Sequence, residues 1–350
     1  MIYLLCISSF AVAVIALGFS YQSLGSYYDR RRYASEGRWI DIGEGRRLYL
    51  LEKGSGETTV LFESGIAATN LNWCHIQEKV SSFSTTASYD RSGLGWSSPC
   101  RSPRTPTNIA SELHQMLSEA GIKPPYVLVG HSFGGLVMRR FALLYPEEVT
   151  SIILVDPMRC EEWPPLDPAK QASIERGSRL TGFAIPIARI GLARLAVTSL
   201  LCGSGQIAER LASAAGNGGK HVLGRIKSEV GKMPQKVWPI VAAHWSRPGY
   251  YAGTRSHVLA VPDTVREMQA AEPIRGTPVL VLTPETSSPL SEDCLRRIGD
   301  NVEQVIVSGS AHWIHLDQPE LVIDSIRGMV TAAAPKEMVL AVDDLQTESV

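Results

Sequence analysis

Ser132 stands in a sequence pattern that can make a serine side chain reactive. The run Tyr126–Val129 is typical of a buried strand, the segment Gly130-His-Ser132-Phe-Gly134 follows it, and a helical pattern leads away. A tight turn between strand and helix strains the backbone of its central residue, and glycine two residues to either side avoids a clash. The dipole of the following helix favours negative charge that develops beside the serine. The pattern therefore predicts a serine nucleophile; the alternative is a glycine-rich turn that carries a surface serine.

A serine is a weak nucleophile at neutral pH and needs a base that takes its proton. His312 is the candidate, because it lies in a loop of small residues between the strand expected at Val302–Val307 and the closing helix. Such a loop can carry the imidazole to the edge of the sheet where the serine lies. His315 is a rival that we expect to be an ordinary loop histidine, and His131, next to the nucleophile, is expected to pack rather than react.

Two preorganised backbone amides would have to stabilise the oxyanion that forms when the serine attacks a carbonyl group. The first is expected to be the N–H of Phe133, directly after the nucleophile. The second should come from the loop after the third strand, Phe62-Glu-Ser-Gly65-Ile66, where Ile66 is the candidate. The alternative for this loop is a plain strand exit that contains a glycine.

Short β-type runs alternate with helical patterns along the chain around these residues. Two of the runs flank the turn Gly43-Glu-Gly45 and predict a hairpin. The alternation predicts an α/β fold with a mostly parallel sheet and crossover helices on its faces. The expected strands lie at 38–42, 46–52, 59–62, 86–89, 126–129, 151–155, 277–282 and 302–307, and the expected helices at 107–120, 134–145 and 319–329.

The interval between Asp156 and Pro278 contains no clear strand. Its apolar stretches at 182–201 and 237–245 indicate helices. The alternation of strands and helices resumes afterwards. This favours a helical cap inserted after the sixth strand over a second independent domain. The expected division is an α/β core at 36–156 and 272–332, a cap at 157–271, an N-terminal membrane anchor or signal segment at 1–21, and a disordered tail at 333–350.

From about Arg38 to Met329 the chain resembles the α/β-hydrolase superfamily. Three segments carry the resemblance: the turn around Ser132, the run Asp90-Arg-Ser-Gly93-Leu-Gly95-Trp-Ser97, and the loop Gly309-Ser-Ala-His312. The second is similar to the family's Asp-Arg-x-Gly-x-Gly-x-Ser turn, and the third to its catalytic-histidine loop. The resemblance implies the α/β-hydrolase fold and a triad in the order nucleophile, acid, histidine. It does not specify the substrate, because this fold hosts many chemistries.

The resemblance leaves two candidates for the acid that orients the histidine. Relatives commonly carry an aspartate after the seventh strand, in a Gly-x-x-Asp pattern, but this place reads Leu282-Thr-Pro-Glu285 and offers only Glu285. The end of the sixth strand, Leu154-Val-Asp156-Pro-Met-Arg-Cys-Glu-Glu162-Trp, is similar to dehalogenase-like relatives whose acid stands there. We favour Asp156 over Glu285; the alternative for Asp156 is a purely structural role, as in many relatives with Val-Asp-Pro at this place.

The run Met1–Tyr21 is uncharged apart from the terminal amine, and its length suits one membrane-spanning helix. Tyr27, Tyr28 and the basic cluster at 30–32 follow, as at a membrane interface. We therefore expect a single uncleaved anchor. The alternatives are a signal peptide that is removed on secretion, although its basic start is missing, and a buried core helix. The arginines favour a cytoplasmic body, but the side of the membrane stays open because a large domain follows the single span.

Composition excludes some classes of partner and cofactor. Lys and Arg number 34 against 35 Asp and Glu, so no global positive charge would attract nucleic acid. The six cysteines are scattered without a C-x-x-C pair or a histidine cluster, so we expect neither a zinc site nor a disulfide framework. There is no glycine-rich dinucleotide fingerprint either, and we expect no cofactor.

Hydrolysis of a carboxylic ester is the reaction that these residues predict. In the superfamily that the chain resembles, dehalogenases and epoxide hydrolases use an aspartate nucleophile, so Ser132 favours acyl transfer to water. The membrane segment and the apolar helices at 182–201, which we expect to line the pocket, suggest a lipophilic small-molecule substrate. The same residues would serve a C–C, amide or lactone hydrolase. A non-catalytic ligand-binding protein on this fold is the alternative from another class.

Overall fold

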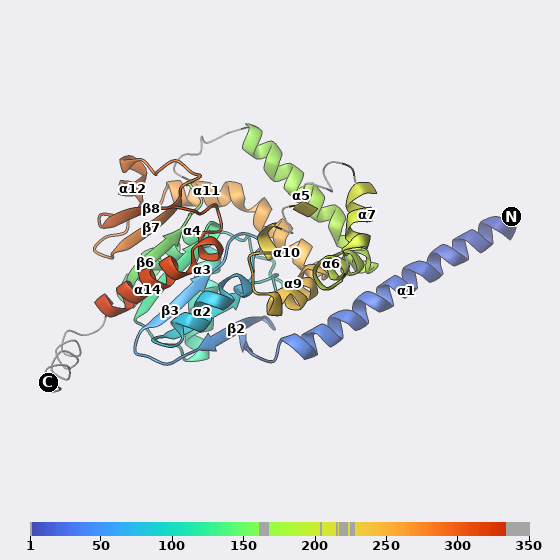
Figure 1. Ribbon diagram of the computed structural model, residues 1–350, viewed down its shortest axis with the longest axis horizontal. Helices are drawn as coiled ribbons and strands as arrows, with labels where there is room; N and C mark the ends of the chain where they lie inside the picture. Colours follow the sequence, from blue (N-terminus) through green and yellow to red (C-terminus); the bar gives the residue numbers. More distant parts are fainter. Residues whose placement is uncertain are drawn as a thin grey trace.

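The computed structural model describes residues 2–160, 168–203, 205–214, 216, 223–224 and 228–333. Its centre is an eight-stranded sheet in the order β1-β2-β4-β3-β5-β6-β7-β8 (Figure 1). β1 and β2 form the predicted hairpin and β2 is antiparallel to β4, whereas the remaining pairs are parallel, which confirms the predicted mostly parallel sheet. The strands are β1 Arg38–Asp41, β2 Arg47–Lys53, β3 Thr59–Glu63, β4 Thr85–Asp90, β5 Tyr126–His131, β6 Val149–Val155, β7 Val279–Pro284 and β8 Val302–Val307.

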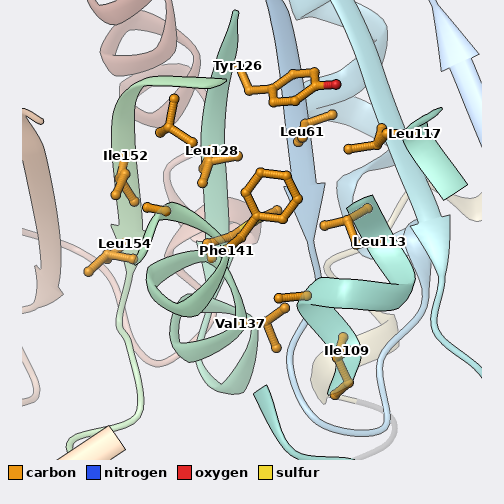
Figure 2. Packing of buried hydrophobic residues seen from close by; sticks show 14 of the residues in the cluster. Leu61, Ile109, Leu113, Leu117, Tyr126, Leu128, Val137, Phe141, Ile152 and Leu154 are labelled. Atoms are coloured by element: carbon orange, nitrogen blue, oxygen red, sulfur yellow. The ribbon is translucent and has the colours of Figure 1, made fainter. Parts of the chain in front are cut away.

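Helices cover both faces of the sheet, because successive side chains of a strand point to opposite faces. In β5, Tyr126 and Leu128 join one apolar core, while Val127 and Val129 join the other. Figure 2 shows the first core, where strand side chains pack against α3 and α4. The second core includes side chains of α2 and α14. The helices of these layers are α2 Cys74–Val80, α3 Pro106–Ala120, α4 Phe133–Leu144, α12 Glu292–Ile298, α13 Ile314–Asp317 and α14 Pro319–Ala333.

A helical cap is inserted between β6 and β7, as the sequence predicts. The apolar stretch expected at 182–201 is divided, because α5 ends at Arg189, α6 begins at Leu192, and the two helices are bent by 93°. Gly191 between them has a φ of 76°, which glycine adopts with little strain. Residues 161–167, and with them the acidic and tryptophan part of the dehalogenase-like stretch, lie outside the described residues. The cap helices are α5 Pro168–Arg189, α6 Leu192–Cys202, α7 Gln206–Ala214, α9 Trp238–Trp245, α10 Pro248–Leu259 and α11 Val261–Gln269.

The N-terminal helix α1, Ile2–Tyr33, extends away from the rest of the molecule over most of its length (Figure 1). Many of its side chains are apolar and exposed, and it is long and apolar enough to cross a membrane. A signal sequence has the same properties, so the structure is compatible with both expectations for this segment. Met1 and residues 334–350, which include nearly all of the expected tail, lie outside the described residues.

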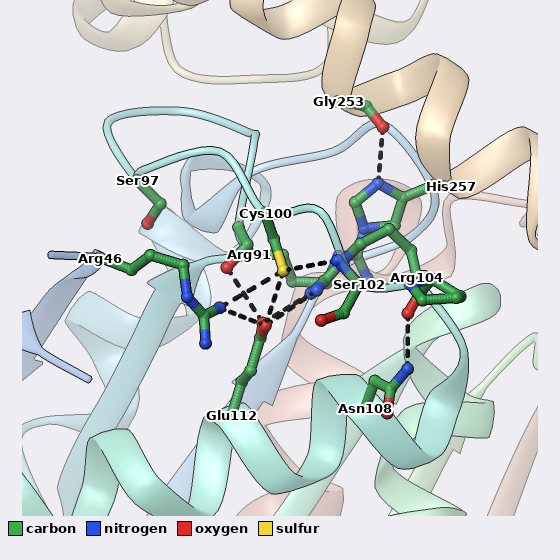
Figure 3. A network of polar contacts seen from close by, with 12 residues as sticks. Arg46, Arg91, Ser97, Cys100, Ser102, Arg104, Asn108, Glu112, Gly253 and His257 are labelled. Carbon is green, nitrogen blue, oxygen red and sulfur yellow. Dashed lines mark hydrogen bonds and ion pairs between the residues drawn. The ribbon is translucent and has the colours of Figure 1, made fainter. Parts of the chain in front are cut away.

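A buried carboxylate on α3 holds the segment that follows β4 (Figure 3). Glu112 accepts hydrogen bonds from Arg46 Nη1 at 2.7 Å, from Arg104 Nη2 at 2.8 Å and from Ser92 Oγ at 3.0 Å. Burial by itself would raise the pKa of Glu112, but the hydrogen bonds and charges of Arg104 and Arg46 outweigh burial and lower this pKa. The ionised carboxylate therefore joins the start of β2, helix α3 and the family-like turn after β4.

Candidate active site

Ser132 lies on a strained turn between β5 and α4, which begins at Phe133. Its backbone has φ 53° and ψ −119°, a conformation that is costly for a residue with a side chain. A Cβ atom added to Gly130 would lie 2.6 Å from Gly134 O, and one added to Gly134 would lie 2.5 Å from Glu63 O. The two glycines of the pattern are therefore required by the close approach of the backbone.

His312 and Asp156 meet although 156 residues separate them in the chain. His312 Nδ1 lies 2.6 Å from Asp156 Oδ2. Asp156 directly follows β6, has a φ of 40°, and donates its backbone N–H to Leu282 O of β7 at 2.8 Å. Because the carboxylate occupies Nδ1, the nitrogen left to exchange a proton with another group is Nε2.

Glu285, the other candidate acid, directly follows β7 and is exposed. Its backbone N–H donates to Val307 O at the end of β8, at 3.2 Å. Within the part of the chain that the structure describes, the carboxylate in contact with the His312 imidazole is that of Asp156. The geometry thus favours Asp156 over Glu285 as the partner of His312.

His131 is buried next to the serine and supports the backbone of the histidine loop. Its Nε2 lies 2.9 Å from the carbonyl oxygen of His312, and because a carbonyl only accepts, this nitrogen must carry the hydrogen. Burial lowers the pKa of His131 well below 6.5, so the ring is neutral. Its ring centroid lies 4.8 Å from that of Trp313. His131 therefore packs, as expected, and in addition holds the loop that carries His312.

His315 is buried behind the same loop. Its ring centroid lies 4.5 Å from that of Trp73 and 4.5 Å from that of His131. Burial and, to a smaller extent, the nearby His312 lower the pKa of His315 to about 3. A neutral imidazole packed between aromatic rings agrees with the expectation that His315 is not the base.

Arg91 holds the loop after β3 that carries Ile66. Its guanidinium donates to Ser64 O at 2.8 Å and to Gly65 O, and it pairs with Glu63 at 3.0 Å. Both side chains of this ion pair are 1% exposed. Ile66 lies in the wall of a cavity that also contains Ser132. In the sequence Arg91 is recognisable only as part of the family-like turn, because its bracing of a loop 26 residues earlier depends on how β3 and β4 pair.

Asp90, the first residue of the family-like turn, is buried and bonded to backbone. Its Oδ2 accepts from the N–H of Trp96 at 2.9 Å, and its Oδ1 accepts from the N–H of Asn70 at 3.2 Å. A Cβ atom added to Gly95 would lie 2.0 Å from Asp90 Oδ2, which explains the glycine. Burial raises the pKa of Asp90 to about 6. This turn therefore shapes the backbone around the site.

A cavity of about 260 Å³ brings Ser132 and His312 into one space. Its wall on the core side is formed by the loop after β3 and by residues next to Ser132 and His312. The expectation that residues 182–201 line the pocket was wrong, because no described residue of that stretch lies in this wall. The cap instead contributes Glu229, Val230, Met233, Val241, His244, Trp245 and Tyr250.

His244 on α9 brings a neutral imidazole into the cap side of the cavity. It is 1% exposed, and its ring packs edge-on against Trp96 with centroids 4.5 Å apart. Burial lowers the pKa of His244 to about 3. Neither ring nitrogen has a hydrogen-bond partner in the described part of the chain. The sequence offered no signal for His244, because the cap carries no family motif.

No group of three or more His, Cys, Asp or Glu side chains among the described residues could hold a metal ion. All six cysteines are free thiols. The described cavity wall contains the Ser132 hydroxyl and the imidazole of His312, which is paired with the Asp156 carboxylate.

Comparison with known sequences agrees with this architecture. Residues 58–195, which include the turn at Ser132 and Asp156, match the family model described as the alpha/beta hydrolase fold. The uncharacterised protein YqjL of Bacillus subtilis is 31% identical over 105 residues, which are 30% of this chain and 42% of YqjL. An AB hydrolase superfamily protein of Gibberella zeae is 31% identical over 120 residues, 33% of this chain and 37% of that protein. The chain thus spans about two fifths of the length of the curated relatives it matches.

Solved structures share the whole fold. The epoxide hydrolase CorEH superposes with a TM-score of 0.64 at 16% identity, covering 85% of this chain and 99% of that one. A thermophilic esterase from Thermogutta terrifontis superposes with a TM-score of 0.58 at 20% identity, with coverages of 85% and 99%. At these identities the likeness shows the fold alone. Together with the family model over residues 58–195, the sheet order and the insertion after β6, it shows that the chain has the α/β-hydrolase fold.

Proposed function

We propose that this chain is a serine hydrolase that cleaves carboxylic esters through an acyl-enzyme. The observation that carries the proposal is that Ser132, on its strained turn, lines the same cavity as His312, whose Nδ1 is held by Asp156. Nucleophile, base and orienting acid are the three roles that acyl transfer by a serine requires.

In the proposed reaction, Ser132 Oγ attacks the ester carbonyl while His312 Nε2 accepts the hydroxyl proton. Asp156 keeps the other proton on Nδ1 and stabilises the imidazolium. The N–H groups of Phe133 and Ile66 donate to the oxyanion. His312 then protonates the leaving alcohol, and an acyl ester of Ser132 remains. Water attacks this ester with His312 as base, the carboxylic acid leaves, and Ser132 regains its proton.

The identity of the nucleophile favours esters over epoxides, although several structural neighbours are named epoxide hydrolases. A serine oxygen that opened an epoxide would form an alkyl ether, which water does not cleave readily. An aspartate forms an ester in the same reaction, and water can release it. Ser132 therefore supports acyl substrates, because only the transfer of an acyl group produces a serine ester that water can hydrolyse.

The cap side of the cavity supports a substrate with an apolar acyl or alkyl group. Val230, Met233, Val241 and Trp245 all lie in the wall. Each methylene group buried against such a wall contributes about 0.8 kcal/mol to binding. We also propose that α1 anchors the protein in a membrane, where lipophilic esters concentrate. The apolar surface of this helix supports an anchor, since its large apolar side chains are exposed along most of its length.

The test is turnover of p-nitrophenyl esters of increasing chain length by the full-length protein in detergent. Ser132→Ala should lose several orders of magnitude in kcat, because no acyl-enzyme can form. Ser173→Ala, which removes an exposed serine hydroxyl on α5, is the matched control and should behave as the wild type. Equal turnover by the wild type and by Ser132→Ala would refute the proposal.

A further inference from the structure

The corner between α5 and α6 exposes a group of large apolar side chains. Leu180 is 60% exposed, Phe183 71%, Ile187 46%, Leu192 43% and Leu195 41%; we call these five residues the cap patch. The spacing of three and four residues within each helix places the side chains on one face of that helix. Contiguous exposed apolar surface of this kind marks a contact with a protein, a ligand or a membrane.

The same corner packs directly against α1 (Figure 1). A Cβ atom added to Gly18 would lie 2.3 Å from Ile190 O, and one added to Gly191 would lie 2.9 Å from Gly18 O, so the two backbones touch. Glycine at these places permits this approach. The contact point lies between the two helices that carry the cap patch.

A buried arginine extends this contact along α1. Arg194 of α6 pairs with Asp29 at 2.6 Å and donates to Gln22 Oε1 at 3.1 Å and to Ser26 Oγ at 3.3 Å. It is only 6% exposed. Residues 18, 22, 26 and 29 share one face of α1, because neighbours on a helix surface are three or four residues apart. The cap is thus held to α1 by backbone contact at one end and by an ion pair at the other.

The position of this contact along α1 fixes the depth of the cap patch. From Leu5 to Gly18 the helix is about 20 Å long, whereas the hydrocarbon core of a bilayer is about 30 Å thick. A span that fills the bilayer has to continue past Gly18 to about Leu24. The α5–α6 corner packs against this last part of the span. The corner therefore has to contact the membrane as long as it packs against α1.

We propose that the cap patch is a second membrane contact, which inserts the α5–α6 corner into the interfacial region of the leaflet beside α1. This inference rests on the proposed anchoring by α1. Arg189 at the end of α5 is exposed beside the corner, and Arg30, Arg31 and Arg32 are exposed further along α1. They favour a leaflet that contains anionic lipids. The exposed side chains of the stretch that we expected to line the substrate pocket thus face lipid, and the protein contacts the bilayer through both α1 and the cap.

The test is photolabelling of the full-length protein in vesicles of phosphatidylcholine and phosphatidylserine, with a phosphatidylcholine that carries a diazirine in its acyl chain. Adducts are located by mass spectrometry of the digested protein. We expect adducts on peptides of α1 and on the peptide that contains Phe183 and Ile187. A peptide of β8 should carry none, although Ile306 there is 44% exposed, because β8 is the outer strand at the far end of the sheet.

The double variant Phe183→Glu/Ile187→Glu should lose the cap adducts and keep those on α1, whereas the matched Ile306→Glu should change neither. Unchanged thermal unfolding would show that the variants fold. Adducts confined to α1 overturn the cap contact and leave the anchor intact, and adducts on neither overturn both. Cross-links from the cap patch to a second copy, in place of lipid adducts, overturn the inference in favour of self-association. No outcome depends on esterase activity, so failure of the proposed reaction is a separate result.

Discussion

The two sides of the cavity are built in different ways. On the core side, the backbone or a specific hydrogen bond fixes each proposed catalytic residue: Ser132 by its strained turn, Asp156 by the N–H bond to β7, and His312 by Asp156 and His131. On the cap side the wall combines the apolar side chains of Val230, Met233, Val241 and Trp245 with Glu229, His244 and Tyr250. From this difference we infer that the proposed reaction depends on the core and the choice of substrate on the cap.

The largest effect should come from the acid on the core side. Asp156→Asn keeps the size of the side chain but stabilises the wrong tautomer of His312, so kcat should fall by about 10⁴-fold. Glu285→Gln, the matched change at the rival acid, should alter kcat by about twofold at most, because Glu285 is exposed. Steady-state kinetics of both variants decide the assignment. The reverse ranking would move the acid to Glu285.

His131 should have the next largest effect, through the position of the histidine loop. His131→Phe keeps the aromatic packing but removes the hydrogen bond to His312 O, and kcat should fall by about 10- to 100-fold. His131→Gln keeps a donor and should recover part of the loss. If the two variants have the same kcat, the hydrogen bond does not position His312.

Acid should lower the free energy of unfolding through one buried histidine of the core and one of the cap. The pKa values of His315 in the core and His244 in the cap are lowered to about 3, so each ring takes up a proton near pH 6.5 only when the chain unfolds. The contribution of each neutral ring to the free energy of unfolding is therefore fully present above pH 6.5. It is lost as the pH falls toward 3. At pH 5.5 the loss is about 1.4 kcal/mol for each histidine.

Denaturant titrations between pH 7.5 and pH 5 measure this loss. His315→Phe should flatten the pH dependence, because it removes the ring that titrates. It breaks no hydrogen bond, since neither ring nitrogen of His315 has a partner in the described part of the chain. A pH profile that is as steep in His315→Phe as in the wild type would mean that His315 does not titrate in this way.

The smallest effect should come from the cap wall, and it should appear in KM. Val241→Ala removes two methyl-sized groups from the wall, so KM for long-chain esters should rise about tenfold or less, with kcat nearly unchanged. Val265→Ala on α11 is the matched control, since Val265 is also buried in the cap but lies outside the wall. A large fall of kcat in Val241→Ala alone would contradict the division between core and cap.

The core was largely predictable from the sequence, because its features are local. The strand, the glycines and the helix around Ser132 lie within one short segment, and the crowding that demands the glycines is produced by that segment and the adjoining loop. The helices α2 and α12 were not predicted, since each has seven residues, too few for a helical period to repeat.

The cap was predictable only as an insertion. Which of its side chains face the cavity depends on the bend at Gly191 and on the packing of α9 and α10 against the core. Apolar composition at 182–201 therefore suggested a pocket lining. In the structure Val197 and Leu201 instead join an apolar cluster formed mostly by the cap, and Phe183, Ile187, Leu192 and Leu195 are exposed. His244 and Arg91 act through contacts that join distant parts of the chain, and local sequence patterns do not predict such contacts.

The most direct test of the central claim is to react the full-length protein with a fluorophosphonate and to locate the adduct by mass spectrometry. A serine that His312 activates should give one adduct, on Ser132, and His312→Ala should slow its formation strongly. An adduct on another serine, or complete inhibition of ester turnover while Ser132 stays unmodified, would contradict the account.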